Sequence, residues 1–551
     1  MSRHSKVGRR RPTGHTFAQA PSVGMPRSKF SRTHGLKTTF NADDLVPILV
    51  DEMLPGDTFN LKLHAFVRMT TPIYPILDNL HLETFFFFVP NRLLWDNWEA
   101  FNGARTGPSD TDTSTQYTVP TITSAAGVSE GTLSDYFGIP TQVTQLTFNS
   151  LHHRAYNLIF NDWFRDENLT DQAVVDTGDG PDTESNYVIR KRAKRHDYFT
   201  SALPWPQKVF TTGGAATSVS LPLGTTAPVK YQLNSNAAVA RNAGSGVLLT
   251  SQTGMTTDAT TAEMRGAPSG TGFVIDPNGT LYADLSTATA ATINDIRLAF
   301  QTQKLYERDA RGGTRYSEIL YQHFKVQSPD SRLQRPELLS VSSSPIQVVP
   351  VAQTTQAATP TSKDGLGNLG GYGVCYPKGH GFTYSATEHG VILGLVNVRA
   401  DLNYQQGLHR MWSRQTRFQF YWPSFAHLGE QDIKNQEIYA QGATVTSGSP
   451  ATTVDSQVFG YQARYDEYRY KPSMITGAFR SNATGAFDAW HLAQDFASLP
   501  VLNNSFIESN TPMSRVQAVS TEPDFFFDGV FKYNCVRPMP VFAIPGLVDH
   551  F

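Results

Sequence analysis

The segment from Thr71 to Gly103, TPIYPILDNLHLETFFFFVPNRLLWDNWEAFNG, constrains the fold of this chain more than any other stretch. Four consecutive phenylalanines, Phe85 to Phe88, place aromatic rings on both faces of an extended strand. A strand with one wet face would alternate apolar and polar residues, so this strand must be covered on both faces, by its own fold or by a neighbour. The apolar residues that follow predict a short amphipathic helix ending at Gly103. The candidate packing residues are Phe85, Phe86, Phe87, Phe88, Trp95 and Trp98.

Apolar patterning along the rest of the chain predicts a mainly β fold with short helices. Residues 58–69 alternate strictly between apolar and polar side chains except at Phe66, which is typical of a half-buried strand. The other predicted strands are 80–89, 390–398, 417–422 and 525–536, and the predicted helices are 151–163, 296–303 and 316–323. Strands that are joined by such long excursions suit a jelly roll and do not suit regular strand–helix alternation.

Residues 1–40 form a candidate basic arm. They hold nine Lys and Arg residues and no Asp or Glu, although the whole chain is nearly neutral, with 46 Lys and Arg against 48 Asp and Glu. Interspersed Gly, Pro and Ser predict a segment that is irregular when alone. A run of cations without anions favours a nucleic acid or another anionic partner over a merely solubilising tail. The candidate DNA-binding residues are Arg3, Lys6, Arg9, Arg10, Arg11, Arg27, Lys29, Arg32 and Lys37.

Two further segments differ from the rest in composition. Of the 85 residues in 211–295, 47 are Thr, Ser, Ala or Gly, and only three are aromatic, so we interpret this block as a surface insertion. The second segment is the basic run 190–196, RKRAKRH, which has Glu184 before it and Asp197 after it. It suits either contact with phosphate or a seam of salt bridges between subunits.

The sequence carries no convincing motif for catalysis, a metal or a cofactor. GLGNLG at 365–370 matches a dinucleotide-binding pattern, but loop sequence stands on both sides where a strand and a helix are needed. The histidines lack partners at zinc-ligand spacing, so we expect packing or surface roles for His152 and His153, and for His380 and His389 in a Gly-rich loop. A calcium ion held by carboxylates and carbonyl oxygens at a subunit seam stays open.

The remaining compositional signals concern the cellular compartment in which the protein resides. The two cysteines, Cys375 and Cys535, are too few for a disulfide scaffold, and we expect two free, buried thiols. The N-terminus has no apolar run, which argues against a secretory signal. No stretch reaches about 18 consecutive apolar residues, so we expect no membrane span.

Long strings of this sequence resemble the major capsid proteins of gokushovirus-like microviruses, which are small icosahedral single-stranded DNA phages. Besides 71–103, the similar stretches include SLHHRAYNLIFNDWFRDENL at 150–169, KRAKRHDYFTSALPWPQK at 191–208 and the 34 residues from Lys304 to Glu337. Further matches are RADLNYQQGLHRMWSR at 399–414, FGYQARYDEYRYKPSMITGAFR at 459–480 and the end, IPGLVDHF. The resemblance runs from about residue 15 to the last residue.

The resemblance implies an eight-stranded viral jelly-roll barrel with long loop insertions and short helices. It divides the chain into a basic arm (1–40), a first jelly-roll part (41–210), a threefold surface insertion (211–295) and a second jelly-roll part (296–551). It implies a non-enzymatic virion protein that is assembled in the bacterial host cytoplasm, with sixty copies forming a T=1 shell around circular single-stranded DNA. The implied partners are an internal scaffolding protein, a DNA pilot protein and a host surface receptor. Phe85–Phe88, Trp95 and Trp98 then become candidates for subunit packing.

An alternative from another class is a soluble jelly roll that binds or hydrolyses carbohydrate. Such a protein needs a concave site with a few convergent polar groups. It needs neither an acid-free basic arm nor a block of four phenylalanines.

Overall fold

Ten strands of this protein join into one antiparallel sheet that folds over on itself. The structure, a computed structural model, describes residues 27–102, 117–206, 334–352, 354, 369–448 and 451–542, together with short strands within 211–283. The strands of the large sheet are β1 (Ser28–Ser31), β2 (His34–Phe40), β3 (Val46–Met53), β4 (Thr58–Met69), β5 (Leu80–Pro90), β16 (Glu337–Ala352), β17 (Leu369–Cys375), β18 (Lys378–Ser385), β19 (Gly390–Ala400) and β26 (Phe525–Arg537).

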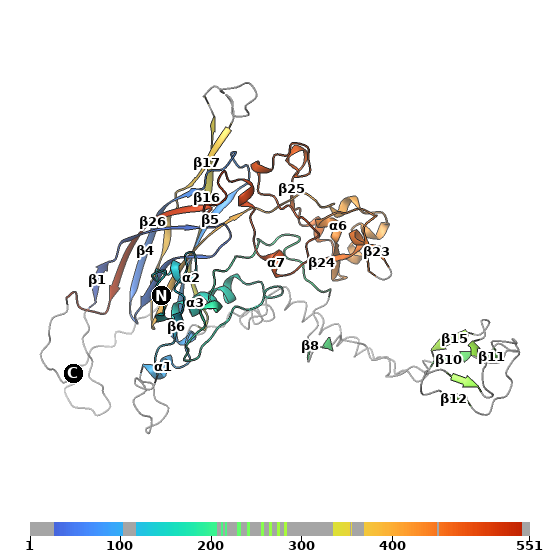
Figure 1. Cartoon of the computed structure of the whole chain (residues 1–551), viewed down its shortest axis with the longest axis horizontal. Helices are drawn as coiled ribbons and strands as arrows, with labels where there is room; N and C mark the ends of the chain where they lie inside the picture. The colour runs from blue at the N-terminus through green and yellow to red at the C-terminus, as the bar shows by residue number, and fades with distance from the viewer. Residues whose placement is uncertain are drawn as a thin grey trace, which may run out of the picture. The chain divides into compact units, whose positions relative to one another are not determined.

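The ten strands occupy eight positions in the sheet, because in two cases two short strands lie end to end and pair with the same neighbouring strand. β1 and β2 both pair with β26, and β17 and β18 both pair with β4. β16 pairs with β5 through its first half and with β17 through its second half, so it links two layers. The layers have the orders β2–β26–β4–β18 and β3–β19–β5–β16, and their curl is visible in Figure 1. This arrangement confirms the predicted eight-stranded jelly roll.

The main hydrophobic core lies between the two layers and takes alternate side chains from both. Along β4 the buried side chains alternate with exposed ones as the sequence predicted, and β26 alternates in the same way. Phe86 and Phe88 of β5 point into this core, where their rings lie 5.2 Å from Phe382 and 5.0 Å from Tyr384. Gly394 lies directly opposite Phe86, and a Cβ there would approach the Phe86 ring to 2.8 Å, so glycine leaves room for the ring.

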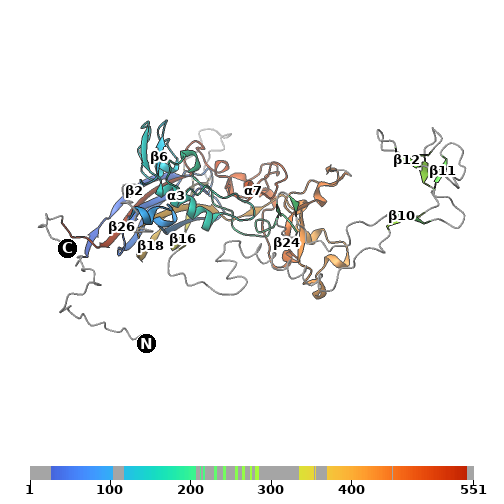
Figure 2. The same ribbon diagram turned by 90° about the horizontal axis from the view of Figure 1, so that it is seen from below.

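A second core covers the other face of the β3–β19–β5–β16 layer. Phe85 and Phe87 point into it from β5, and helix α3 (Leu151–Ile159) and the π-helix η2 (Phe160–Phe164) pack over them. Figure 2 shows α3 beside the sheet. The other elements near this core are η1 (Asn91–Leu93), α1 (Trp98–Phe101), β6 (Thr121–Ser124), α2 (Leu133–Tyr136), β7 (Leu146–Asn149) and η3 (Glu184–Asn186).

A third, smaller core gathers around Phe199, Ile433 and Phe459. It is built from short elements with long connections: β20 (Asn403–Tyr404), η4 (Arg410–Trp412), η5 (Arg417–Gln419), η6 (Pro423–Phe425), β21 (Glu430–Lys434), α6 (Asn435–Ile438), β22 (Thr446–Ser447), β23 (Thr452–Thr453), η7 (Val454–Ser456), β24 (Val458–Ala463), η8 (Asp466–Tyr468), β25 (Ser473–Met474), η9 (Gly477–Phe479), η10 (Asp488–Trp490), α7 (Asn504–Ile507) and η11 (Met513–Arg515).

The chain divides into two compact units, and the second runs from Gln207 to Val326. The predicted insertion, 211–295, lies within it, and the unit also takes in 296–326, which the sequence assigned to the second jelly-roll part. Its described strands are β8 (Thr211–Thr212), β9 (Ala215–Ala216), β10 (Val229–Gln232), β11 (Ala240–Asn242), β12 (Met255–Thr257), β13 (Met264–Gly266), β14 (Phe273–Ile275) and β15 (Thr280–Ala283). The domain limits themselves stay a prediction.

Part of the basic arm, which the sequence predicts to be irregular when alone, is ordered by the sheet, since residues 28–31 and 34–40 form β1 and β2 at its edge. Two local predictions are wrong. Residues 417–422 do not form a strand, since η5 begins at Arg417 and Thr416 N donates a hydrogen bond to the Gln419 side chain, 2.9 Å away. His380 lies in strand β18 and not in a loop.

Other local predictions are confirmed or lie outside the described residues. Cys375 and Cys535 are free and buried, as expected. The π-helix η2 continues the predicted helix at 151–163, and α1 forms part of the one expected before Gly103. The predicted helices at 296–303 and 316–323, and Gly365–Asn368 of the GLGNLG motif, lie outside the described residues.

Candidate assembly and nucleic-acid surfaces

The aromatic residues singled out by the sequence are covered by the subunit's own fold. Phe85, Phe86, Phe87, Phe88 and Trp95 are all buried within one chain. The Trp95 indole donates a hydrogen bond to Asp179, 2.7 Å away. The fold of one subunit therefore covers these five side chains, which is one of the two possibilities that the sequence left open, and their role in packing between subunits stays a prediction. Trp98 is half-buried and packs against Phe101 and His389.

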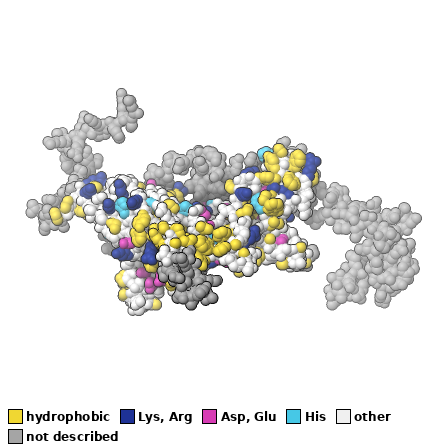
Figure 3. Space-filling view, turned by 90° about the horizontal axis from the view of Figure 1, so that it is seen from above, with side chains coloured by type: hydrophobic (Ala, Val, Ile, Leu, Met, Phe, Trp, Pro, Cys, Tyr) yellow, Lys and Arg dark blue, Asp and Glu magenta, His cyan; other side chains and the backbone are white. Residues whose placement is uncertain are grey.

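The ends of the 71–103 segment remain candidates for a seam. At its start, Ile73, Tyr74 and Leu77 are exposed, and the Tyr74 ring stacks on Trp490 with the ring centres 5.0 Å apart. Figure 3 shows hydrophobic side chains gathered in the middle of the visible face and again toward its right-hand end. Apolar patches of this kind on a folded protein mark interaction sites.

A large exposed aromatic surface, which sequence reasoning missed as a site, follows strand β20. Its two most exposed members are Trp412, at 72% exposure, and Phe418, at 63%. We name as the aromatic surface the exposed residues Leu408, Met411, Trp412, Phe418, Phe420, Tyr421, Trp422, Leu428, Tyr468, Tyr470 and Met474. The alternation of aromatic and polar residues at 417–422 was the available signal, and it was interpreted as a strand.

Buried ion pairs beneath the aromatic surface hold it in place. Arg414 contacts Glu467 at 2.8 Å and lies over the Tyr468 ring at 4.2 Å. Arg410 contacts Glu437 at 3.1 Å, and the Tyr198 hydroxyl donates to the same carboxylate. Burial raises the pKa of Glu437, although Arg410 opposes that rise. Ion pairs that are sheltered from water therefore link the short elements that carry the aromatic surface, η4 to α6 and the residue Arg414 to η8.

Arginines of the basic run 190–196 form ion pairs within the subunit. Arg192 pairs with Glu83, and Arg195 contacts both Glu83 at 3.4 Å and Asp401 at 2.9 Å. Arg399 approaches Glu83 at 3.2 Å. Burial alone would raise the pKa of Glu83, but Arg192 and Arg399 hold it below its usual range. The salt bridges foreseen between subunits are, for these residues, bridges within one subunit.

Asp44 lies opposite Lys191 of the same run and provides a test of pH dependence. Burial raises the pKa of Asp44 to about 6, with Lys191 opposing the rise. The folded state therefore keeps this proton up to a higher pH than the unfolded chain, so stability is lost as pH rises from about 4 to about 6. We expect Asp44→Asn to match the wild type near pH 4 and to exceed it by up to about 3 kcal/mol above pH 6.

Urea unfolding of the isolated subunit across this pH range measures the effect of Asp44→Asn. A constant stability difference between variant and wild type across the range would show that the Asp44 carboxyl titrates alike in the folded and unfolded chain.

The candidate DNA-binding residues divide into two groups. Arg3, Lys6, Arg9, Arg10 and Arg11 lie outside the described residues. Among the rest, Arg32 pairs with Asp51 and lies over the Tyr533 ring, whereas Arg27 is exposed. Lys29 and Lys37 are exposed on β1 and β2, at the edge of the large sheet. The structure thus brings Lys29 and Lys37 onto the jelly roll itself.

The described residues include neither a candidate metal-binding cluster nor a candidate membrane-spanning helix. No three His, Cys, Asp or Glu side chains in that part of the chain are placed to hold a metal ion. Buried His153 lies 2.9 Å from Ser134, and His380 lies 2.9 Å from both Thr84 and Ser344, so both are packing histidines. Among the described helices, none is long and apolar enough to cross a bilayer.

Known proteins match this chain over almost its whole length. The family described as "Capsid protein (F protein)" matches residues 18–547. The chain is 48% identical to capsid protein VP1 of Bdellovibrio phage phiMH2K, with 98% of both chains covered. It is 43% identical to capsid protein VP1 of Chlamydia phage 1, with 98% of this chain and 99% of the relative covered. It is 32% identical to that of Spiroplasma virus 4, with 97% of each covered.

These matches do not support the carbohydrate-binding or hydrolytic alternative. The exposed aromatic rings of this extensively packed jelly roll fit a protein that assembles with other copies, since interfaces between subunits are enriched in aromatic residues. With a family match across residues 18–547, the chain belongs to the capsid protein (F protein) family and is a structural component of a virion, not an enzyme.

Proposed function

We propose that this major capsid protein assembles as sixty copies into a T=1 icosahedral shell around a circular single-stranded DNA genome. The observation that carries the proposal is the exposed aromatic surface fixed by buried ion pairs, because a closed shell requires large seams on a rigid subunit. Among the described strands, β2 and β3 pair on one side only, and closure of a shell would protect such edge strands from uncontrolled pairing.

Electron microscopy and sedimentation of the purified full-length chain test this proposal. We expect closed particles with a protein mass near sixty times 60.9 kDa. A protein that stays monomeric at all concentrations, with or without DNA and the phage's other proteins, would contradict it.

The proposal includes partners besides the capsid protein itself. They are an internal scaffolding protein and a DNA pilot protein, which act during assembly in the bacterial host cytoplasm, and a host surface receptor, which meets the 211–295 insertion at the threefold protrusions. The support for the insertion's role is its position within a compact unit of its own and its small, polar composition.

Replacing residues 211–295 with a short Gly-Ser bridge should leave a folded subunit and abolish host adsorption. Loop closure depends weakly on loop length, and this block holds little apolar material for the jelly-roll core. The measurements are the thermal unfolding midpoint of the subunit and the adsorption of particles to host cells. An unfolded deletion variant would show that the block belongs to the core, and unimpaired adsorption would place receptor binding elsewhere.

The basic arm should contribute to DNA binding mainly through charge. Each phosphate contact to single-stranded DNA adds roughly 0.7 to the slope of log affinity against log salt. Removing residues 2–37, with all nine cations, should therefore reduce the slope by at most about 6, with little dependence on base sequence. This truncation also deletes β1 and part of β2, so a truncation of residues 2–26 is the matched variant that leaves the sheet intact. If the salt slope were unchanged in both truncation variants, the arm would contact a protein partner and not DNA.

A further inference from the structure

One exposed sheet face of the jelly roll carries many cations and almost no acid. Along β1, β2, β4, β18 and β26, every second side chain points away from the core. We name this surface the basic face, after its exposed cations Lys29, Lys37, Lys62, Arg68, Lys378 and Lys532. Asp528 is the single carboxylate in the described residues of these five strands. Lys and Arg side chains also gather at the left-hand end of the surface in Figure 3, the end at which β1 and β26 lie in Figure 1.

Two lysines of the basic face lie directly opposite each other. Lys62 of β4 and Lys532 of β26 are partners in the antiparallel register, so their side chains leave the sheet side by side. Like charges in such a pair destabilise a sheet. Neither lysine forms an ion pair with a described residue, although ion pairs are frequent elsewhere in the subunit. An anion bound between the two ammonium groups would remove this repulsion.

Aromatic rings are interleaved with these cations. Phe66, Phe526 and Tyr376 are exposed by 39%, 38% and 60%, and the rings of Phe66 and Tyr376 lie 5.2 Å apart. Phe526 lies opposite Arg68, and Phe66 precedes Arg68 by two residues on the same face of β4. Aromatic rings on a sheet surface beside cations suit unstacked bases and their phosphates, because each base has a flat face to stack.

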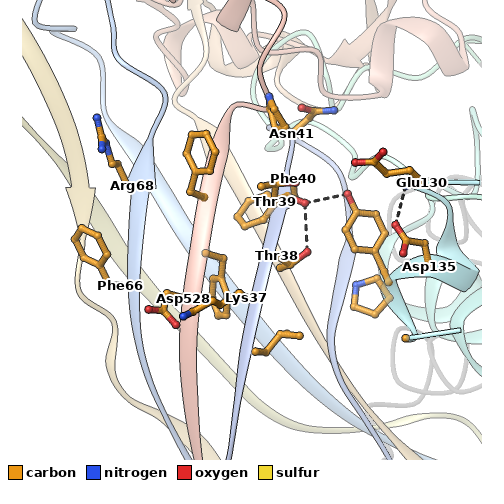
Figure 4. Close-up of a pocket in the computed structure, with 18 residues that line it drawn as sticks. Lys37, Thr38, Thr39, Phe40, Asn41, Phe66, Arg68, Glu130, Asp135 and Asp528 are labelled. Carbon is orange, nitrogen blue, oxygen red and sulfur yellow. Dashed lines mark hydrogen bonds between the residues drawn. The ribbon is translucent and has the colours of Figure 1, made fainter. Parts of the chain in front are cut away.

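A pocket of about 970 Å³ continues the basic face beyond the edge strand β2. Figure 4 shows Lys37, Phe66, Arg68 and Asp528 on the sheet side of it and Glu130 and Asp135 on the opposite side. The Tyr136 hydroxyl crosses between the two sides and donates a hydrogen bond to Thr39 O, 3.0 Å away. The carboxylates repel phosphate, so a bound strand would run its backbone along Lys62 and Lys532 and direct bases toward Phe66 and Phe526.

We propose that the basic face binds a single-stranded nucleic acid, with phosphates held by Lys62 and Lys532 and bases stacked on Phe66, Phe526 and Tyr376. This inference rests on the proposed function, in which the shell encloses single-stranded DNA, and it adds a second contact that is independent of the arm cations at residues 3–11. Duplex DNA fits poorly, because its bases already stack on one another and present only edges.

The charge half of the proposal is tested with the full-length subunit and a fluorescent oligo-dT in a salt series. Lys62→Gln with Lys532→Gln should lower the slope of log affinity against log salt by about 1.4, which is two phosphate contacts. Lys62→Arg with Lys532→Arg should restore the slope. The control is Lys471→Gln, which changes an exposed lysine outside the basic face and should leave the slope unchanged.

The stacking half is tested by comparing oligo-dT with an abasic oligonucleotide of the same length and charge. Phe66→Leu with Phe526→Leu should weaken oligo-dT binding by about fivefold or more and leave both the abasic affinity and the salt slope unchanged. The control is Phe418→Leu, an exposed aromatic residue of the aromatic surface. Because the substituted side chains are all exposed, unfolding midpoints should match the wild type and confirm that each variant is folded.

Three results would overturn the inference: an unchanged salt slope in the Lys62/Lys532 variant, equal wild-type affinity for oligo-dT and the abasic strand, or tighter binding of duplex than of oligo-dT. Failure of the proposed function looks different, because purified particles would then contain no single-stranded DNA. Particles that package DNA normally while the face variants bind oligo-dT like the wild type would leave the proposed function intact and reject the basic face.

Discussion

Phe86→Ala should make the yield of particles collapse by destabilising the subunit. The Phe86 side chain is 0% exposed and lies in the core between the two layers, against Phe382 and opposite Gly394. Removing so large a buried ring costs about 3–5 kcal/mol. The free energy of unfolding of an ordinary domain is only about 5–15 kcal/mol, so a substantial fraction of the variant subunits would be unfolded and unable to assemble.

The measurements for Phe86→Ala are the soluble yield, the thermal unfolding midpoint and the particle count in electron micrographs. Phe542→Ala is the matched control, because it removes the same side chain from a strongly exposed position. The control should keep wild-type yield and midpoint. Normal particle yield with Phe86→Ala would count against the packing role of the ring.

The strands that sequence reasoning predicted correctly are those with the strongest apolar patterns. In residues 58–69, and in 525–536 after its first phenylalanines, apolar and polar side chains largely alternate. Because successive side chains of a strand point to opposite faces, this alternation predicts burial of one face. Residues 80–89 and 390–398 are apolar on both faces, which fits their central place between two cores. The topology that joins them came from the family resemblance, since patterns within strands do not specify which strands pair.

The missed elements lack such patterns. β16 is rich in serine, and its burial alternates only over residues 340–347 and not at either end, so apolar patterning does not mark the whole strand. β2 was assigned to the arm because Gly, Pro and Ser are interspersed in that part of the sequence, although Phe40 anchors the strand in the core. At 417–422, alternation alone predicted a strand, but a strand also needs a partner backbone, and the following Pro423 begins another 3-10 turn.

The candidate surfaces were predictable only in part, for the same reason. The sequence places Lys62 and Arg68 on the polar side of β4, but only the register shows Lys532 opposite Lys62. It also identifies Phe85–Phe88 as packing residues, whereas the assignment of that packing to one subunit depends on helix α3 and the π-helix covering the sheet. The rings that we propose for contact with neighbouring subunits are those of the aromatic surface, and their one sequence pattern, the alternation at 417–422, predicted a strand and not an exposed surface.

Replacing Trp412 and Phe418 together with serine should abolish assembly while leaving the subunit folded. Both side chains project from short 3-10 turns into solvent, so their loss removes almost no packing within the chain. Surface substitutions of this kind change stability by about 0.5 kcal/mol or less. At a seam, a large aromatic side chain contributes about 2 kcal/mol or more, and a closed shell repeats that loss at every copy.

The unfolding midpoint and sedimentation of the Trp412/Phe418 variant separate the two effects. We expect a wild-type midpoint together with free subunits in place of particles. Tyr376→Ser is the matched control, because it removes an exposed aromatic ring from the basic face and should leave assembly intact. Assembly of the double variant at the wild-type concentration would place the seams outside the aromatic surface, and loss of assembly in the control as well would show that the basic face itself contacts a neighbouring subunit.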